Sequence, residues 1–513
     1  MLIAWISDEQ FLAVPDALVT VEGAGTLRSG ADGSVHGDLA PGRYAVTVAR
    51  AGFGSKRTTI EVGDGLPATQ LRILSETIYG FAWPKWVCAG ETASVHVHSP
   101  RPYRLALARL GADAGPEQVL GWFDEHGPRT TVQTTPDGDY TQTGVDWHAA
   151  LSLHAPAEPG LYVFRTEDGS GARTTFPWIV APAAPAARTA VLVSTNTWNA
   201  YDSFGGRSNY ISADRLPGAP TVVARDDLLR YRGVREHRHP DEAYTPLSFR
   251  RPDPANQVTE ERPDEPLRGR QPCHLAASVW RLLAWLEREG FAYDLYADAQ
   301  LHDGTLDLAR YDVLVLDAHP EYWTRTMVDR VDAFVHAGAG KLLYLGGNGL
   351  DCEVELLDGD ALRFRTERVE PGGPFESRLH RTHRPTAGLL GVCFDERGIM
   401  TAAPYEVVAP GHWAFAGTGL TPGERFGTAS LHERCPGGAS GHETDKRTAA
   451  TPDGAVLLAR GLNPGGGGAE LVWYGTETGG EVFAAGSIAW IASLLVDEAV
   501  SRITRNALER FLS

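Results

Sequence analysis

The chain has 513 residues, with 47 Lys and Arg against 65 Asp and Glu, and a formal net charge of −18. A hydrophobic content of 42% and a charged content of 22% are typical of a soluble globular protein and exclude disordered, collagen-like and coiled-coil chains. The negative charge repels polyanions and no strong basic patch offsets it, so we expect neither nucleic acid nor an anionic membrane as a partner. The length predicts about three domains.

The cysteines and the first residues indicate a reducing compartment. The five cysteines are odd in number, far apart and never in a CxxC arrangement, which argues against a disulfide framework and a cysteine zinc site. Asp8 and Glu9 interrupt the start of the chain, which has no basic segment of the kind that opens a secretory signal. No run approaches the roughly 18 apolar residues of a membrane span. We therefore expect a cytoplasmic protein.

The first third of the chain reads as two small all-β, sandwich-like domains. Residues 1–76 alternate in short strands with dense turn residues, and LAPGRYAVTVARAGF resembles a strand and turn of prealbumin-like modules. Residues 77–185 form a second β-rich stretch, with TASVHVHS and GLYVFRT among its candidate strands. Pro and Ala dominate VAPAAPAARTA, which predicts a linker and a boundary near Pro185.

From residue 186 to residue 513 the pattern changes to strands that alternate with helices. AVLVSTN, VLVLDA and KLLYLGG are apolar runs, whereas residues 274–290 and 327–338 have the apolar spacing of helices. Such runs predict a mostly parallel sheet covered on both faces. We therefore expect an α/β catalytic domain, glutamine-amidotransferase-like or flavodoxin-like, after the two β domains.

Polar side chains follow three of the predicted strands. In open α/β sheets ligands bind at the carboxyl ends of the strands, where the strand-to-helix loops gather. The sequence therefore predicts a site at this edge. Its candidate residues are Tyr201 and Tyr210 after the first strand, His319, Glu321 and Tyr322 after the second, and Asn348 after the third.

Several chemistries find no support in the sequence. There is no GxSxG nucleophile motif, no GxGxxG after a strand and no HExxH zinc motif, and Cys352 lies several residues beyond the strand end. A cysteine amidohydrolase therefore finds little support. A site rich in phenol and carboxylate oxygens instead favours a hard, highly charged cation such as ferric iron, which can hold a tyrosine deprotonated.

Several ordered motifs then point to one family. They are FAWPKWV, GWFDEHGPR, STNTWNAYDSFGGRSNY, AYTPLSFRRP, VLVLDAHPEYW, LLYLGGNGL, LHERCPGGASGHETDKR and AAGSIAW. Together they resemble the large (β) subunit of N,N-dimethylformamidase and its relatives, over about residues 80–510. The resemblance implies amide hydrolysis at a mononuclear ferric centre held by two tyrosinates and one glutamate.

Carried over residue by residue, the resemblance places the first tyrosine at Tyr201 in WNAYD and the glutamate at Glu321 in HPEYW. The second tyrosine falls on Tyr244 in AYTPLSFRRP, with Tyr210 and Tyr231 as competitors. In this scheme the iron acts as a Lewis acid on the carbonyl of a small N-substituted amide and activates a water.

The resemblance implies roles beside the metal for His319, Asn348 and Glu443. His319 or Glu443 would carry a proton to the leaving amine, and Asn348 would stabilise the oxyanion. Simpler interpretations also stand. Asn348 between glycines would suit a left-handed turn, and Glu443 would pair with Lys446 or Arg447 on the surface.

Two alternatives and one question about assembly stay open at this point. The chain would hydrolyse a different small amide on the same site, or it would be a non-catalytic protein that binds carbohydrate or another small molecule. The enzyme of the family pairs its large subunit with a small one, so the resemblance implies a small subunit, a homo-oligomer or both as partners.

Overall fold

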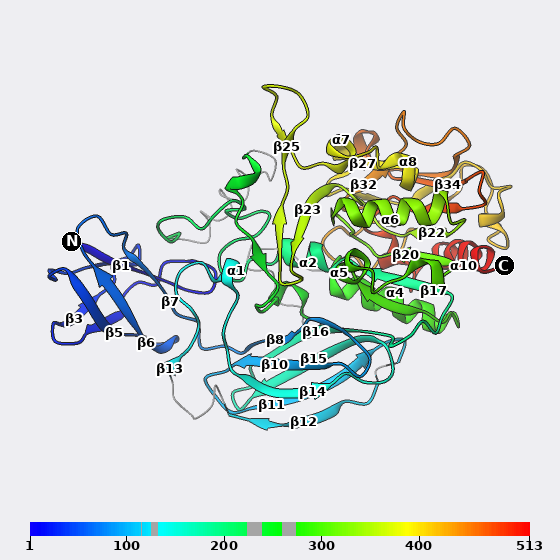
Figure 1. Ribbon diagram of the computed structural model, residues 1–513. Helices are drawn as coiled ribbons and strands as arrows, with labels where there is room; N and C mark the ends of the chain where they lie inside the picture. Colours follow the sequence, from blue (N-terminus) through cyan, green and yellow to red (C-terminus); the bar gives the residue numbers. More distant parts are fainter. Residues whose placement is uncertain (114, 125–131, 223–238, 259–272) are drawn as a thin grey trace.

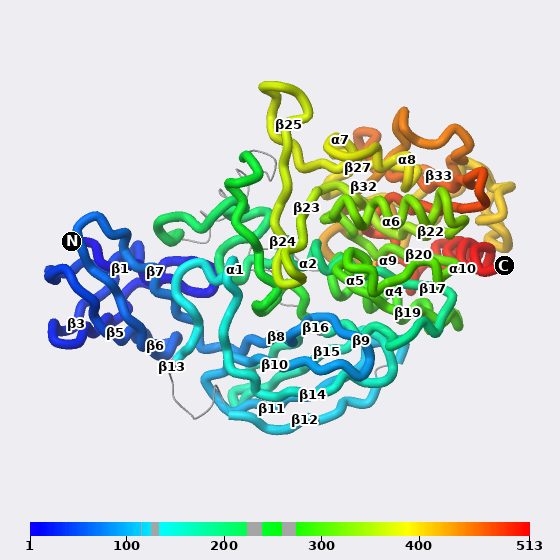
Figure 2. Tube along the Cα trace, viewed as in Figure 1, coloured from blue at the N-terminus to red at the C-terminus, as the bar shows by residue number. Residues whose placement is uncertain are grey.

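The computed structural model describes residues 1–113, 115–124, 132–222, 239–258 and 273–513 (Figure 1). Three groups of sheets follow one another along the chain, and the two termini lie at opposite ends of the molecule (Figure 2). The division into domains at residues 76 and 185 stays a prediction. Among the described residues, no helix has both the length and the apolar character needed to cross a membrane.

Two small sheets form the N-terminal group. Their orders are β4-β1-β7 and β13-β6-β5-β2-β3, so a short strand from beyond residue 130 completes the second sheet. Alternate residues such as Val19, Val46 and Ile60 point inward and form one apolar core. The strands are β1 (Leu2–Ser7), β2 (Leu18–Val21), β3 (Gly25–Arg28), β4 (Ser34–His36), β5 (Gly42–Arg50), β6 (Gly54–Val62), β7 (Thr69–Arg72) and β13 (Val132–Gln133).

A β-sandwich follows, with a three-stranded sheet (β14-β10-β8) packed on a five-stranded one (β12-β11-β15-β16-β9). Side chains of both sheets, among them Val95, Phe164 and Trp178, share one apolar core. The elements are β8 (Tyr79–Trp83), β9 (Trp86–Cys88), β10 (Thr92–His98), β11 (Tyr103–Leu110), β12 (Gln118–Phe123), α1 (Tyr140–Thr143), β14 (Ala149–His154), β15 (Gly160–Asp168) and β16 (Arg173–Ala181).

The C-terminal group is built on a nine-stranded sheet. Its order is β19-β17-β20-β22-β35-β34-β33-β29-β30, and the first five strands are parallel. The strands are β17 (Thr189–Val193), β19 (Asp294–Ala297), β20 (Val313–Leu316), β22 (Lys341–Tyr344), β29 (Tyr405–Val407), β30 (Arg425–Phe426), β33 (Val456–Gly461), β34 (Glu470–Gly475) and β35 (Glu481–Ala484).

Helices cover both faces of this sheet. Val191 and Val193 of β17 belong to the core shared with α4 and α10, whereas Ala190 and Leu192 belong to the core shared with α6. A strand buried in this way on both faces has no polar positions, which explains its apolar sequence. The helices are α2 (Thr195–Tyr201), α4 (Ala276–Arg288), α5 (Asp298–Asp303), α6 (Arg325–His336), α7 (Leu379–Thr382), α8 (Ala387–Leu390), α9 (Trp490–Ser493) and α10 (Glu498–Leu512).

Short strands and turns lie outside these three groups. The order β18-β24-β23-β21 forms a four-stranded sheet beside the nine-stranded one. The remaining strands are β18 (Leu247–Ser248), β21 (Tyr322–Trp323), β23 (Cys352–Leu357), β24 (Ala361–Phe364), β25 (Glu367–Arg368), β26 (Phe375–Glu376), β27 (Cys393–Asp395), β28 (Ala402–Ala403), β31 (Ser440–Gly441) and β32 (Thr444–Lys446). Single 3-10 turns span Asp241–Ala243, Pro254–Asn256, Leu308–Arg310, Glu396–Gly398, Trp413–Phe415 and Pro464–Gly466.

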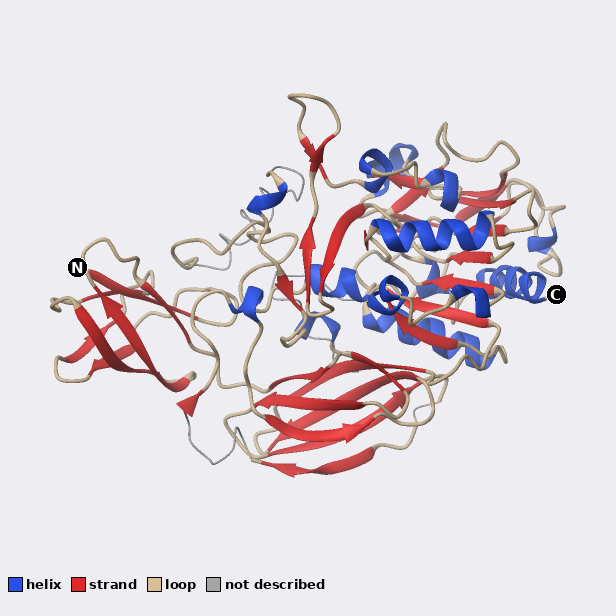
Figure 3. Ribbon diagram, viewed as in Figure 1, coloured by secondary structure: helices blue, strands red, loops and turns tan. Residues whose placement is uncertain are grey.

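The predicted fold class, a mostly parallel α/β domain after two β domains, is wrong. Among the described residues, strands account for 35% against 18% for helices, and the strands are spread over many small sheets. Helices gather around a single sheet (Figure 3), in which all pairs from β35 to β30 are antiparallel. A β-dominated, sandwich-like architecture describes the chain better. The error arose because a strand buried on both faces is an apolar run whichever way its neighbour points.

Candidate functional site

Tyr201 is the last residue of α2, the short helix that follows β17. Ser194 lies between the two elements and donates from its backbone N–H to Asp317 Oδ2 (3.1 Å), while its hydroxyl donates to Asp317 Oδ1. Asp317 directly follows β20, so this contact ties two neighbouring strand ends together. As a result α2 begins at the carboxyl edge of the sheet, and Tyr201 is buried there.

The loop after β20 carries His319 and Glu321. Thr197 of α2 fixes this loop, because its hydroxyl donates to the His319 carbonyl (2.9 Å) and accepts from the Glu321 N–H (3.2 Å). His319 Nδ1 lies 3.1 Å from the carbonyl oxygen of Gly347, which can only accept, so Nδ1 carries a proton. The other ring nitrogen, Nε2, faces Glu321 and Tyr201.

Four side chains meet at one buried point. The Tyr201 hydroxyl donates to Glu321 Oε2 (2.7 Å) and accepts from the Tyr210 hydroxyl (2.7 Å). His319 Nε2 lies 2.8 Å from the Tyr201 oxygen and 3.0 Å from Glu321 Oε2. The exposed fractions of Tyr201, Glu321 and His319 are 5%, 6% and 1%. Two phenol oxygens, a carboxylate and an imidazole thus converge in a nearly dry place.

Asn348 and Glu443 border this cluster. Asn348 Nδ2 donates to Glu443 Oε2 (2.8 Å), which lies 3.8 Å from His319 Nε2. Asn348 has a left-handed backbone with φ of 51°, and Asp445 holds it there by accepting from its N–H (2.7 Å). The left-handed turn considered as the simpler interpretation is therefore present, and it places the amide beside the cluster.

The surface partners considered for Glu443 have contacts elsewhere. Lys446 donates to the carbonyl oxygen of Gly466 (2.5 Å), and Arg447 donates to Glu470 (2.9 Å). The carboxylate of Glu443 instead faces Asn348 and His319 from the inner side of the same segment.

The electrostatics of the cluster suit a cation. Burial raises the pKa of Tyr201 well above that of a free phenol, and the charge of Glu321 raises it further. Burial also raises the pKa of Glu321. Burial alone would lower the pKa of His319, but its hydrogen bond with Glu321 and the charge of Glu443 raise it to about 9. The negative charges of the Tyr201 and Glu321 oxygens would repel each other, and a hard, highly charged metal ion bound between them would remove this repulsion.

Tyr244 and Tyr322, also considered for the site, both pack against Phe364, and the Tyr322 ring lies 6.1 Å from that of Tyr201. The Tyr244 ring packs 6.0 Å from that of Phe364, and its hydroxyl accepts from the His239 N–H (3.4 Å). Phe364 in turn packs 5.8 Å from Tyr322. Tyr231 lies outside the described residues.

Sequence reasoning missed His274. Its ring centroid lies 5.6 Å from that of Tyr201 and 5.5 Å from that of His319. It precedes α4 in the segment CHLAAS, which matches no motif. The sequence feature that could have identified His274 is its position just before a buried helix, α4.

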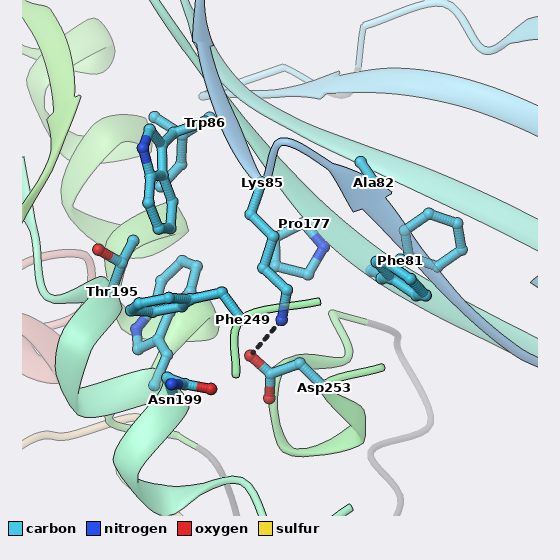
Figure 4. A pocket seen from close by; sticks show the side chains of 12 residues that line it. Phe81, Ala82, Lys85, Trp86, Pro177, Thr195, Asn199, Phe249 and Asp253 are labelled. Carbon is cyan, nitrogen blue, oxygen red and sulfur yellow. Dashed lines mark ion pairs between the residues drawn. The ribbon is translucent and has the colours of Figure 1, made fainter. Parts of the chain in front are cut away.

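A separate small cavity lies on the other side of α2, between the helix and the sandwich (Figure 4). Lys85 points into it toward Asp253, with 3.8 Å between Nζ and Oδ2, among Trp86, Phe249 and Asn199. Its volume of about 20 Å³ has room for a single water. The cavity is therefore a small gap in the packing between α2 and the sandwich, and it is too small for a substrate.

Comparison with known proteins places the whole region around the cluster in one family. Residues 104–503 match the sequence profile described as "N,N-dimethylformamidase beta subunit-like, C-terminal". The chain belongs to this family. The match covers more than half of the chain and includes all the candidate residues, so the resemblance seen in the motifs is confirmed.

Individual relatives in the family are distant. The N,N-dimethylformamidase beta subunit of Paracoccus aminophilus is 28% identical over 290 residues, and that of an Alcaligenes species is 29% identical over 290 residues. Each match covers 46% of this chain and 37% of the relative. The chain thus matches little more than a third of the length of these relatives.

Solved structures add little. A DUF3823 family protein from Bacteroides ovatus has a TM-score of 0.13 at 12% identity, covering 35% of this chain and 98% of that one. Latent PorU from Porphyromonas gingivalis has a TM-score of 0.12 at 12% identity, covering 34% of this chain and 17% of that one. Scores this low identify no shared fold.

Proposed function

We propose that this chain is the catalytic part of an iron-dependent hydrolase of small N-substituted amides. The observation that carries the proposal is the buried meeting of Tyr201, Glu321 and His319 within the region that matches the family. The relatives are named N,N-dimethylformamidase, which suggests N,N-dimethylformamide as substrate, with formate and dimethylamine as products. A different small amide is the alternative substrate, because contacts in the pocket select the substrate independently of the metal.

A mononuclear ferric ion is the proposed cofactor, with Tyr201 and Glu321 as two of its ligands. The fit rests on the donor set: buried phenol and carboxylate oxygens that lie 2.7 Å apart, with the imidazole of His319 beside both. The resemblance assigns the second tyrosine to Tyr244. Tyr210 competes for this role, because its hydroxyl lies 2.7 Å from that of Tyr201.

When bound, the ferric ion would polarise the amide carbonyl and make a water more acidic. The residues around it supply the rest of the chemistry. Asn348 has two amide hydrogens, of which one serves Glu443 and the other is available to an oxyanion. The hydrogen bond with Glu321 and the charge of Glu443 raise the pKa of His319 against the effect of burial, and its Nε2 faces the cluster, so this side chain is suited to deliver a proton to the leaving amine.

Metal analysis together with a visible spectrum of the purified protein tests this proposal. Tyrosinate bound to ferric iron absorbs visible light, so the protein should be coloured, contain iron and release amine from N,N-dimethylformamide. A colourless, iron-free protein that hydrolyses no small amide would contradict it. Glu321→Gln should lose the metal.

Phenylalanine variants identify the second tyrosine. Tyr201→Phe should bleach the colour in either case. Loss of colour in Tyr244→Phe but not in Tyr210→Phe supports the ligand set implied by the resemblance. The reverse pattern assigns the second position to Tyr210.

We also propose that the chain works with a partner subunit, since its relatives are named beta subunits. Light scattering of the chain purified alone, and again after co-expression with a small subunit, measures this. A mass that stays at one chain in both samples would contradict it, and a multiple of the chain mass in the first sample indicates a homo-oligomer.

A further inference from the structure

The carboxylate of Glu321 faces two different sets of side chains. Its Oε2 accepts from Tyr201 and lies beside His319, as described above. Its Oε1 lies 3.8 Å from the sulfur of Cys352, on the side of the carboxylate away from this pair. Glu321 is therefore placed to belong to two sites at once.

Asp351 and Cys352 are held against Glu321 by the backbone. The N–H groups of both residues donate to the Glu321 carbonyl oxygen, at 3.0 Å and 2.9 Å. The Cys352 sulfur also lies 3.9 Å from Asp351 Oδ2. One ligand atom from each of the three residues lies within 4.8 Å of the other two, and all three residues are buried.

The hydrogen bonds available to this group do not satisfy it. A thiol has one proton, and both carboxylate contacts of Cys352 would need one. Tyr322 adds a second observation. It is completely buried, pairs in register with Cys352, and its hydroxyl has no hydrogen-bond partner among the residues that the structure describes. That hydroxyl lies within reach of electrostatic interaction with Glu321 and Cys352.

Two cationic side chains lie beside the group. His380 Nδ1 lies 3.7 Å from Asp351 Oδ1, and Arg378 is close enough to interact with both Asp351 and Cys352. The other oxygen of Asp351, Oδ2, is the one that faces the Cys352 sulfur. Asp351 Oδ2, Cys352 Sγ and Glu321 Oε1 therefore form the edge of the group on which the three ligand atoms face one another.

We propose that Glu321, Asp351 and Cys352 hold a divalent transition-metal ion, with the Tyr322 hydroxyl beside it. The sulfur-to-oxygen distances of 3.8 Å and 3.9 Å are close to the edge of about 3.6 Å of a tetrahedral zinc site with one sulfur and several oxygens. A thiolate among carboxylates selects Zn²⁺ or Fe²⁺ over Mg²⁺ and Ca²⁺. This inference rests on the proposed function only in that Glu321 Oε2 serves the ferric ion there, which leaves Oε1 for the second ion.

Co²⁺ added to the purified full-length chain is the probe. Thiolate bound to Co²⁺ absorbs in the near ultraviolet, whereas the proposed ferric ligands include no sulfur, so this band distinguishes a sulfur-containing site from the ferric one, and its dependence on Cys352 identifies the new site. Wild type and Cys88→Ser, a half-buried cysteine in β9, should both give the band and bind one Co²⁺ with it. Cys352→Ser should lose the band, and Asp351→Asn should bind Co²⁺ at least about tenfold more weakly.

The outcomes separate this site from the proposed function. A band that persists in Cys352→Ser, or no band in the wild type, overturns the second site even if the protein is coloured by iron. A Co²⁺ band that depends on Cys352 in a protein without ferric colour supports the second site and contradicts the iron proposal. If Cys352→Ser does not fold, the weakening of Co²⁺ binding in Asp351→Asn decides, and unchanged binding overturns the site.

Discussion

At the scale of single residues, the candidate site depends on a crowded turn after β22. Tyr344 donates from its hydroxyl to Asp445 Oδ2 (2.7 Å) and accepts from the Gly349 N–H (2.8 Å), while Asp445 Oδ1 accepts from the Asn348 N–H (2.7 Å). A Cβ atom at Gly347 would lie 2.5 Å from the Glu443 carbonyl oxygen and 2.7 Å from the Ile488 nitrogen. Both are backbone atoms, so the turn and the segment of Glu443 are fitted to each other.

Gly347→Ala should therefore disturb the contact between Asn348 and Glu443. The added methyl group forces the two backbones apart, which should destabilise the fold by about 1–3 kcal/mol and lower the rate of amine release. Gly411→Ala is the matched control, because a Cβ there meets nothing within 4 Å. Thermal unfolding and amine-release assays of both variants check this. Equal effects of the two substitutions would mean that the close approach at Gly347 has no role.

The sequence predicted several site residues but not their contacts. Tyr201, His319 and Asn348 follow three strands that lie side by side in the sheet, and the strand-end rule alone brought them together. The hydrogen bond from Tyr210 and the position of His274 depend on loops whose course has no periodic pattern. Such contacts become visible only once the chain is folded.

At the scale of elements, the contact between Ser194 and Asp317 joins the ends of β17 and β20. Burial raises the pKa of Asp317 to about 6, although its hydrogen bonds with Ser194 act in the opposite direction. The folded protein thus keeps this proton at pH values where the unfolded chain, with a pKa of 3.8, has released it. The stability that results is complete below about pH 4 and is lost as the pH rises through about 6.

Asp317→Asn removes this titration and isolates its effect. The stability of the wild type relative to the variant should increase by up to about 3 kcal/mol between pH 7 and pH 4. Unfolding midpoints of both proteins at several pH values within this range measure the change. A difference that stays constant with pH, or grows toward pH 7, would contradict the raised pKa.

The elements themselves were more predictable than their arrangement. The apolar spacing of residues 274–290 and 327–338 identified α4 and α6, and the apolar runs identified β17, β20 and β22. The predicted direction of the strands was wrong, since β33, β34 and β35 follow one another through short connections and run antiparallel. An apolar run indicates that a strand is buried on both faces. Whether that strand pairs parallel or antiparallel with its neighbour depends on the segment that connects the two strands, which lies outside the run.

At the scale of the whole molecule, Arg72 at the end of β7 connects the N-terminal sheets to the rest. It is completely buried, and its guanidinium donates to the carbonyl oxygens of Asp8 (2.8 Å), Gly138 (3.0 Å) and Gly205 (3.0 Å). It also lies over the ring of Tyr140, 4.3 Å from its centroid. Three distant segments thus share one cation. Nothing in the sequence around Arg72 predicted this, because each acceptor is a backbone carbonyl and has no sequence signal.

Arg72→Met should loosen the N-terminal sheets and leave the candidate site intact. Loss of the guanidinium leaves buried carbonyl groups without a donor, at a cost of about 1–3 kcal/mol for each group that water cannot reach. Limited proteolysis followed by mass spectrometry should therefore show faster cleavage near residues 1–76, while the visible absorption proposed for the iron site is retained. Arg57→Met, at an exposed position of β6, is the matched control and should resist cleavage as the wild type does. Equal cleavage of the two variants would show that the N-terminal sheets are held by their apolar core and not by Arg72.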